Sequence, residues 1–415
     1  MEFFYIFSAI LVISAIFAYI NQKYIKLPGA IGLLLAGLLI SLLVQGLGVV
    51  SPGFERAVEG WLSEIDFSEV LLEFMLSFLL FAGALHTDFE KLRQSKWPIL
   101  VFATVGVMIS TFITGTAFYY LLQLMGQPVA YIYCLLFGAL ISPTDPIAVL
   151  GILKKANIPK QLEVSITGES LFNDGVGVVV FIALFQVAQR GVENVSGGFI
   201  GELFLLEVGG GIGLGLLIGF IAFYFMKRLD HYQTEVLISL AVVTGGYSLA
   251  HFLHFSGPLA MVAAGLLIGN QGTQLAMSQI TADYLTKFWE MVDEVLNAVL
   301  FVLIGLELML IPFHSNYIVI GLISTVIVLL VRYIALAIPS YTLQLHRTFT
   351  PNTLPIMTWG GLRGGISIAL ALSLTTEMNR ELIVAITYTV VLMSLMLQGL
   401  TIEPFIKRLS RKMHT

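Results

Sequence analysis

The stretch Gly168-Glu169-Ser170-Leu171-Phe172-Asn173-Asp174-Gly175 places two acidic side chains and an amide in an apolar segment that continues to Phe181. The length and apolar character of the segment predict a membrane-spanning helix. A carboxylate near the centre of a bilayer costs several kcal/mol unless it is paired or faces a water-filled cavity. Two carboxylates beside a buried Asn are hard to explain by packing alone, so they indicate a site that binds a cation or a proton.

The composition excludes a soluble globular protein. The chain has 415 residues, of which 57% are hydrophobic and 11% are charged, whereas soluble domains carry about 25% charged residues. The only cysteine is Cys134, so an intrachain disulfide is impossible. The first apolar run, residues 3–20, lacks a basic leading region, and we interpret it as the first helix and not as a cleaved signal.

We predict an all-α polytopic membrane protein with about thirteen transmembrane helices, because a span needs about 20 mostly apolar residues. The predicted spans are 3–20, 28–47, 68–86, 97–123, 130–153, 163–189, 202–226, 233–253, 257–270, 284–309, 317–343, 353–374 and 381–406. The connections between them are too short to hold a soluble domain.

The basic residues are distributed unequally between the two sides of this layout. Most of the 21 Lys and Arg residues follow odd-numbered spans, and only Arg56, Arg190 and Arg380 lie in loops on the other side. Cytoplasmic loops collect Lys and Arg. We therefore expect the N-terminus outside and the C-terminus in the cytoplasm.

Two spans carry helix breakers at matching places. The fifth contains Ser142-Pro143-Thr144-Asp145-Pro146, and the twelfth contains Gly360-Gly361-Leu362-Arg363-Gly364-Gly365. Broken backbone at membrane depth is tolerated where it is buried in protein or lines a cavity. Because the two spans are seven apart, the second half is inverted relative to the first. We predict one repeat over 1–189, a linker helix over 202–226 and an inverted repeat over 233–408, which is typical of a secondary transporter.

Asp174 is the best candidate for the ion and proton site, since one carboxylate can hold either a cation or a proton. Na⁺ is a hard cation, for which oxygen ligands are expected. Ser170 lies on the same helix face at i and i+4, and the Thr144 hydroxyl with freed carbonyls of the first break could complete the shell. The alternative is a structural acid satisfied by nearby hydroxyls.

The neighbours of Asp174 have predicted supporting roles. Asn173 points about 100° away around the helix, so it orients broken backbone or packs structurally. Arg363 needs a carboxylate or several carbonyls because it stays charged, and we expect Glu169 to form its ion pair. Asp145 is expected to neutralise partial charges at the helix breaks, with direct ion contact as its second role.

Further charged residues lie inside the predicted spans. Arg332 is expected to pair with Glu294 or Asp293. Glu73 and Glu207 either line the ion path or face a partner subunit. Each is a functional candidate because charged residues within membrane spans are rare.

These motifs, together with Asn297 to Glu307 and Trp359 to Gly364, resemble those of cation/proton antiporters of the NhaP and eukaryotic NHE type over nearly the whole chain. The resemblance implies a thirteen-span homodimer whose core domain moves past a dimer domain. It implies Asp174 as the carrier, Thr144 and Ser170 as ion ligands, and Glu169 paired with Arg363. The adjacent Asn173 and Asp174 imply exchange of one Na⁺ for one H⁺.

The sequence thus predicts a secondary-active antiporter that exchanges Na⁺ or Li⁺ for H⁺, with no enzymatic activity, cofactor or nucleic-acid partner. A K⁺/H⁺ antiporter on the same fold is the first alternative, because these residues do not set the size of the ion site. A cation channel or sensor is the second alternative. The chain lacks the long C-terminal tail of eukaryotic members, so we expect a prokaryotic inner membrane protein.

Overall fold

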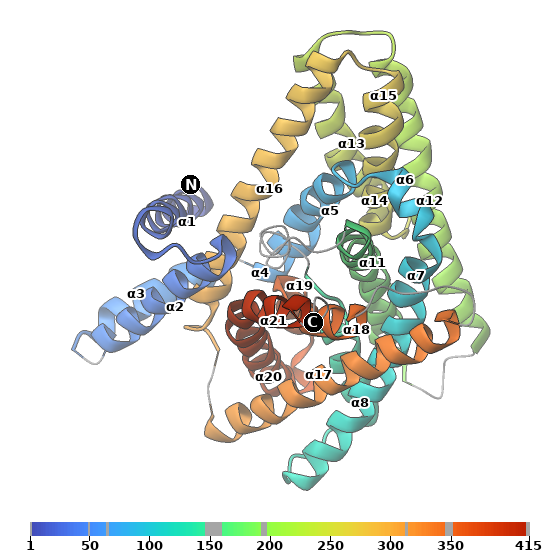
Figure 1. The fold of residues 1–415 in the computed structure, drawn as a ribbon. Helices are drawn as coiled ribbons and strands as arrows, with labels where there is room; N and C mark the ends of the chain where they lie inside the picture. Colours follow the sequence, from blue (N-terminus) through green and yellow to red (C-terminus); the bar gives the residue numbers. More distant parts are fainter. Residues whose placement is uncertain are drawn as a thin grey trace.

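A computed structural model describes residues 2–48, 50–63, 66–145, 160–191, 197–311, 314–344 and 352–411. Every regular element in these ranges is helical, as the sequence predicts (Figure 1). The first part of the chain contains α1 (Glu2–Ile20), η1 (Asn21–Ile25), α2 (Gly29–Gly48), α3 (Pro52–Ser63), α4 (Phe67–Glu69), η2 (Val70–Met75), α5 (Leu76–Leu85), α6 (Phe89–Gln94), α7 (Lys96–Val101), η3 (Phe102–Gly106), α8 (Val107–Leu124), α9 (Tyr131–Ile141) and α11 (Lys160–Arg190).

The second part begins with the long helix α12 and ends with the broken and curved helices of the C-terminal region. Its elements are α12 (Gly197–Met226), α13 (Tyr232–Phe252), α14 (Gly257–Leu267), η5 (Ile268–Gly272), α15 (Thr273–Leu275), α16 (Gln279–Glu307), α17 (Ser315–Gln344), α18 (Thr353–Trp359), α19 (Gly365–Leu372), η6 (Thr376–Met378), α20 (Arg380–Met393), η7 (Ser394–Gln398) and α21 (Gly399–Arg411).

Within the described ranges, helices cover most of the apolar segments that the sequence predicts as spans. Nine helices of the described ranges are long and apolar enough to cross a membrane. The remaining predicted spans are short or interrupted, so the number of thirteen crossings stays a prediction. The helix α3 lies in a region that the sequence predicts as a connection. With 12 residues and several polar side chains, it is too short and too polar to be recognised as a membrane span.

The helices pack in two groups on either side of α11. One group consists of α8, α9, α17, α19 and α20, which pack on one another. The other contains α2 against α16, and α14 against α5, α12 and α13. Figure 1 shows α11, α18 and α19 near the centre of the molecule, with α1–α3 and α12 at its periphery.

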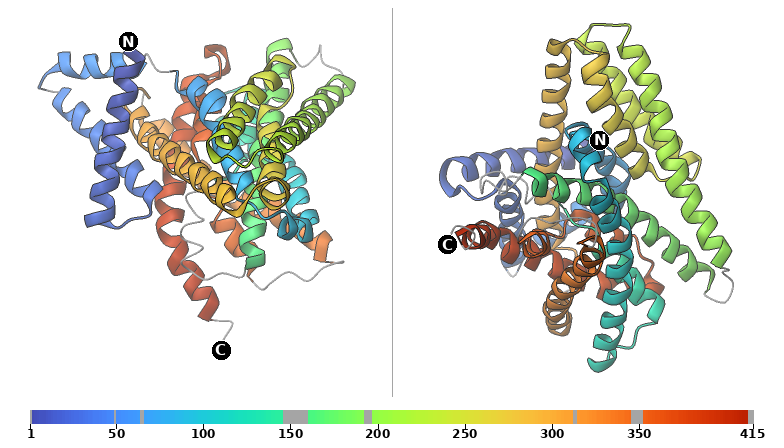
Figure 2. Two further views of the ribbon diagram at one scale, coloured as in Figure 1. Left: turned by 90° about the horizontal axis from the view of Figure 1, so that it is seen from above. Right: turned by 45° about the vertical axis from the view of Figure 1, so that its right-hand side comes forward.

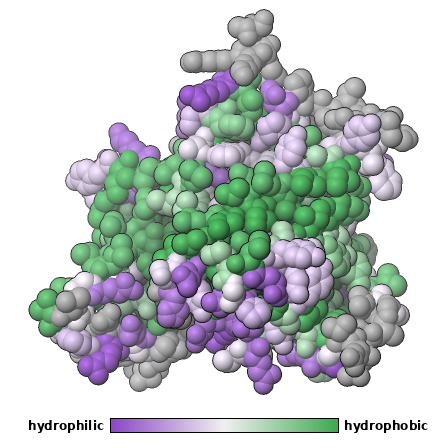
Figure 3. All heavy atoms as spheres, turned by 90° about the horizontal axis from the view of Figure 1, so that it is seen from below, coloured by the Kyte–Doolittle hydropathy of each residue, from purple (hydrophilic) through white to green (hydrophobic). Residues whose placement is uncertain are grey.

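The surface and the termini suit a membrane-embedded molecule. Figure 3 shows a hydrophobic band across one face, with hydrophilic residues gathered above and below it. In the left view of Figure 2, the start of α1 and the end of α21 lie at opposite ends of the molecule. An odd number of crossings requires this arrangement.

Candidate functional site

The two predicted helix breaks cross each other at the centre of the fold. The first follows α9 at Ser142, and the second separates α18 from α19. The backbone N–H of Asp145 donates to the carbonyl of Leu362 at 2.8 Å. Pro146 and the continuation of the first broken segment lie outside the described residues. The crossing explains why both spans carry breakers, since unwound backbone frees N–H and C=O groups for each other.

Arg363 joins the two breaks through its guanidinium. Its Nη1 donates to the carbonyl oxygens of Ser142 at 2.6 Å and Pro143 at 2.8 Å. These carbonyls lie at the end of α9, where a helix carries partial negative charge. Arg363 is 2% exposed, so the carbonyls supply the polar contacts that a buried guanidinium needs.

The predicted ion pair between Glu169 and Arg363 is wrong. Glu169 instead pairs with Arg332 of α17: Arg332 Nη1 and Nη2 each donate to one carboxylate oxygen at 2.7 Å. The two exposures are 1% and 5%. The predicted pairing of Arg332 with Glu294 or Asp293 is wrong for the same reason. Arg363 is satisfied by carbonyls, and a flat guanidinium binds one carboxylate best in the bidentate manner that Arg332 adopts.

Asn173 contacts the backbone and the side chain of Thr144 in the first break, the contacts that its predicted role as an orienter of broken backbone requires. Its side-chain oxygen accepts from the backbone N–H of Thr144 at 3.3 Å, and its Nδ2 donates to Thr144 Oγ1 at 2.8 Å. The same Nδ2 donates to Glu169 Oε1 at 2.9 Å. One buried amide therefore links the broken backbone to the Glu169–Arg332 ion pair.

Ser170 and Thr144 contact each other next to the first break. The Ser170 hydroxyl donates to the carbonyl oxygen of Thr144, and the two hydroxyls are 3.3 Å apart. Neither residue lines that cavity. Their expected role as ion ligands therefore stays a prediction.

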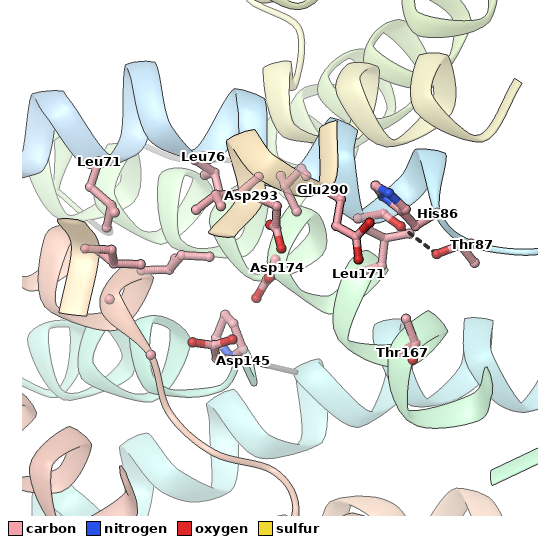
Figure 4. A pocket seen from close by; sticks show the side chains of 18 of the residues that line it. Leu71, Leu76, His86, Thr87, Asp145, Thr167, Leu171, Asp174, Glu290 and Asp293 are labelled. Carbon is pink, nitrogen blue, oxygen red and sulfur yellow. Dashed lines mark hydrogen bonds between the residues drawn. The ribbon is translucent and has the colours of Figure 1, made fainter. Parts of the chain in front are cut away.

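A cavity of about 520 Å³ reaches from the molecular surface to Asp174. Its wall includes Asp145 of the first break and Gly364 of the second, so the crossing forms its inner end. Asp174 is 7% exposed and makes no hydrogen bond or ion pair with the described residues. In Figure 4 the carboxylates of Asp174 and Asp293 point into the same space, with Asp145 beside them. Several carboxylates around one water-accessible space attract a cation.

Most of the cavity wall is not predicted from the sequence. Its additional polar residues come from the α5–α6 connection, α6, α11, α16 and α19: His86, Thr87, Asp88, Lys91, Glu163, Thr167, Glu290, Asp293 and Ser367. The sequence predicts Asp293 only as a possible partner of Arg332. Glu290 and Asp293 are three residues apart on one helix face, which is a signal in the sequence, but the helix facing them cannot be deduced from it.

Polar groups gather at the exposed end of the cavity. The Asp88 carboxylate accepts from the backbone N–H groups of Glu90 and Lys91 at 3.0 and 3.2 Å. Hydrogen bonding to the Lys91 side chain and backbone lowers the pKa of Asp88 from its ordinary value. An ionised carboxylate at the mouth favours the approach of cations over anions.

The other charged candidates lie away from this cavity. Glu73 in η2 and Glu294 in α16 are exposed, and Glu207 in α12 is buried at a distance from the cavity wall. None of the three contributes to the cavity around Asp174. Their predicted roles in an ion path therefore have no support from its geometry.

Comparisons with known proteins agree with this architecture. The family model for the transmembrane region of sodium/hydrogen exchangers matches residues 11–408. The chain is 48% identical over 408 residues to the Na⁺/H⁺ antiporter NhaP of Pseudomonas aeruginosa, covering 97% of this chain and 96% of that one. It is 35% identical over 394 residues to the Na⁺/H⁺ antiporter NhaH of Halobacillus dabanensis, covering 93% of each.

Among solved structures, the sodium proton antiporter MjNhaP1 of Methanocaldococcus jannaschii at pH 8 shares the fold. The TM-score is 0.78 at 20% identity, with 99% of both chains covered. The matched family model, together with relatives that are similar over almost their whole length, shows that this chain belongs to the sodium/hydrogen exchanger family of membrane transporters.

Proposed function

We propose that this protein exchanges Na⁺ for H⁺ across a membrane, with Asp174 as the group that carries either ion. The observation that supports this proposal is the position of Asp174. Its carboxylate is largely buried, has no partner among the described residues and lies at the inner end of a polar cavity. A structural acid at that depth would be paired, as Glu169 is with Arg332.

The proposed ligands of Na⁺ are the Asp174 carboxylate with the oxygens of Ser170 and Thr144. Ser170 and Thr144 lie within one helical turn of Asp174 or in the adjoining break, but their hydroxyls contact each other in this conformation. Ion binding would therefore require a small rearrangement of the first break. Asp145 lines the same cavity and is the nearest further source of oxygen ligands.

Alternating access would explain why, in the described part of the chain, the cavity beside Asp174 opens on one side of the molecule only. The cavity opens beside Asp88 and Lys91, on the side where basic residues predict the cytoplasm. The hydroxyl of Ser68 in α4 donates to the carbonyl of Ala369 in α19 at 2.9 Å, and both residues are buried. A channel needs an open path, so this contact favours a carrier. We also propose that the chain contains two inverted repeats, that its N-terminus lies outside, and that it forms a homodimer in the inner membrane.

The proposal is tested with purified protein in proteoliposomes that contain a pH-sensitive dye. Na⁺, Li⁺ and K⁺ are added in turn, and the proton movement that each one drives is recorded. Response to Na⁺ and Li⁺ supports the proposal. Response to K⁺ alone identifies a K⁺/H⁺ antiporter on this fold, and cation flux without proton movement would indicate a channel.

A further inference from the structure

Two side chains of the last predicted span hold the unwound backbone of the second break. Gln398 Nε2 donates to the carbonyl of Trp359 at 3.1 Å, and the Ser394 hydroxyl donates to Gln398 Oε1 at 2.6 Å. The Ser394 oxygen also accepts from the backbone N–H of Arg363 at 3.1 Å. These bonds form a continuous chain from the end of α18 to Arg363, and we call the residues Ser394 and Gln398 the splint.

The splint lies in a local distortion of its helix. Ser394 and Gln398 are the first and last residues of η7, a π-helical turn between α20 and α21. Both are buried, at 1% and 6% exposure. Single π-helical turns within α-helices occur frequently at functional sites. Here the turn brings two polar side chains to the break, where buried polar groups need partners.

The position of Arg363 couples the splint to the ion site. The Arg363 side chain donates to the carbonyls of Ser142 and Pro143, and the neighbouring Leu362 carbonyl accepts from Asp145. A small cavity of about 10 Å³ adjoins Ser394, Gln398 and Arg363. A shift of the Arg363 backbone would therefore reach Asp145, which lines the cavity with Asp174.

The first break has a corresponding arrangement. There the backbone N–H of Thr144 donates to Asn173, which lies 29 residues later in the next predicted span. At the second break the N–H of Arg363 donates to Ser394, 31 residues later and again in the next predicted span. Each break thus has one freed N–H that donates to a side chain of the following span.

We propose that Ser394 and Gln398 are positioning residues for ion exchange, which fix the second break so that Arg363 and Leu362 support the first break and Asp145. This inference rests on the proposed function, because positioning is defined relative to ion binding at Asp174. Ser394 and Gln398 do not contact the ion themselves. Their effect on transport would pass through the geometry of the crossing.

The test compares Ser394→Ala, Gln398→Met and the double variant with the wild type. Ser394→Thr keeps the hydroxyl and serves as the rescue. Thr401→Val is the matched control, because Thr401 accepts from the indole Nε1 of Trp359 at 2.9 Å without contacting the broken backbone. The measurements are the apparent KM for Na⁺, the maximal rate and the pH profile of exchange in proteoliposomes, with the Na⁺-dependent shift of melting temperature in detergent.

We expect each single variant to raise the KM for Na⁺ by a factor on the order of ten, the size of one lost hydrogen bond. The double variant should be no worse than the stronger single, since both residues act through one chain. Ser394→Thr and Thr401→Val should retain the wild-type KM.

Two results would overturn the proposal. One is a wild-type KM and pH profile in both Ser394→Ala and Gln398→Met. The other is a lower melting temperature with unchanged KM, which marks a purely structural role. Failure of the wild type to exchange ions refutes the proposed function by itself. In that case the Na⁺-dependent shift of melting temperature still compares ion binding between the wild type and the variants. Equal shifts in all of them would overturn the proposed role of the splint.

Discussion

Glu169 and Arg332 form a buried bidentate ion pair between α11 and α17, with two N–O distances of 2.7 Å across 163 residues of sequence. Glu169 also accepts from Asn173, which holds Thr144. The ion pair is therefore linked to the first break through Asn173. It also leaves Asp174 as the unpaired carboxylate of the motif among the described residues.

The first prediction concerns this ion pair. Glu169→Ala should destabilise the protein by about 3–5 kcal/mol because it leaves the Arg332 charge buried and unpaired. Arg332→Ala should have a similar effect, and the double variant should lose less than the sum of the singles. Thermal melts in detergent measure these losses. The control is Glu169→Ala with Arg363→Ala, and stronger coupling there than with Arg332→Ala would contradict the structure.

The second prediction concerns Asp174. Asp174→Asn should abolish exchange without unfolding the protein, since the amide keeps the shape but cannot carry the proton. Glu294→Gln makes the same chemical change on an exposed part of α16 outside the cavity and should retain exchange. Dye-monitored exchange in proteoliposomes measures both, with size-exclusion profiles as the check on folding. Substantial Na⁺-driven proton movement by Asp174→Asn would falsify the carrier assignment.

The third prediction concerns the crossing at Gly364. A Cβ at this position would lie 2.5 Å from Asp145 Oδ2 and 2.7 Å from its Cβ. Gly364→Ala should therefore push the two breaks apart, cost about 1–3 kcal/mol of stability and reduce exchange. Gly213→Ala is the control, because nothing lies within 4 Å of a Cβ there. Equal melting temperatures and rates for both variants would show that the crossing tolerates displacement.

Local signals in the sequence predict most of the helices of this fold, with α3 as an exception. Long apolar runs predicted the helices, and the proline and glycine clusters predicted both breaks. The angle of Asn173 on the helix, which differs from that of Asp174, predicts that it orients broken backbone or packs structurally, and its contacts with Thr144 agree with the first role. These inferences depend on helical periodicity and local composition, both of which can be read from residues that are close together in the sequence.

The partners of buried charges could not be deduced in the same way. Two arginines lie in predicted spans, Arg332 and Arg363. Which of them pairs with Glu169 depends on how α17 packs against α11. Arg363 donates to backbone carbonyls and not to a carboxylate. This choice of partner follows from the way the two breaks cross, which the sequence does not give. Likewise, Asp293 and His86 come from separate helices, and their common cavity follows from tertiary packing.

The last prediction is that transport is electroneutral. One carboxylate alternates between Na⁺ and H⁺, so the loaded carrier has the same charge in both directions. Asn173 cannot ionise, and Glu169 is neutralised by Arg332. Since the two ions compete for one group, the apparent affinity for Na⁺ should weaken as the pH falls. Exchange is measured in proteoliposomes with and without a clamped membrane potential, together with currents on a solid-supported membrane. A rate that follows the imposed voltage, or sustained charge movement in each turnover, would refute one-for-one exchange and make Asp145 or Asp293 the next candidate for a second proton carrier.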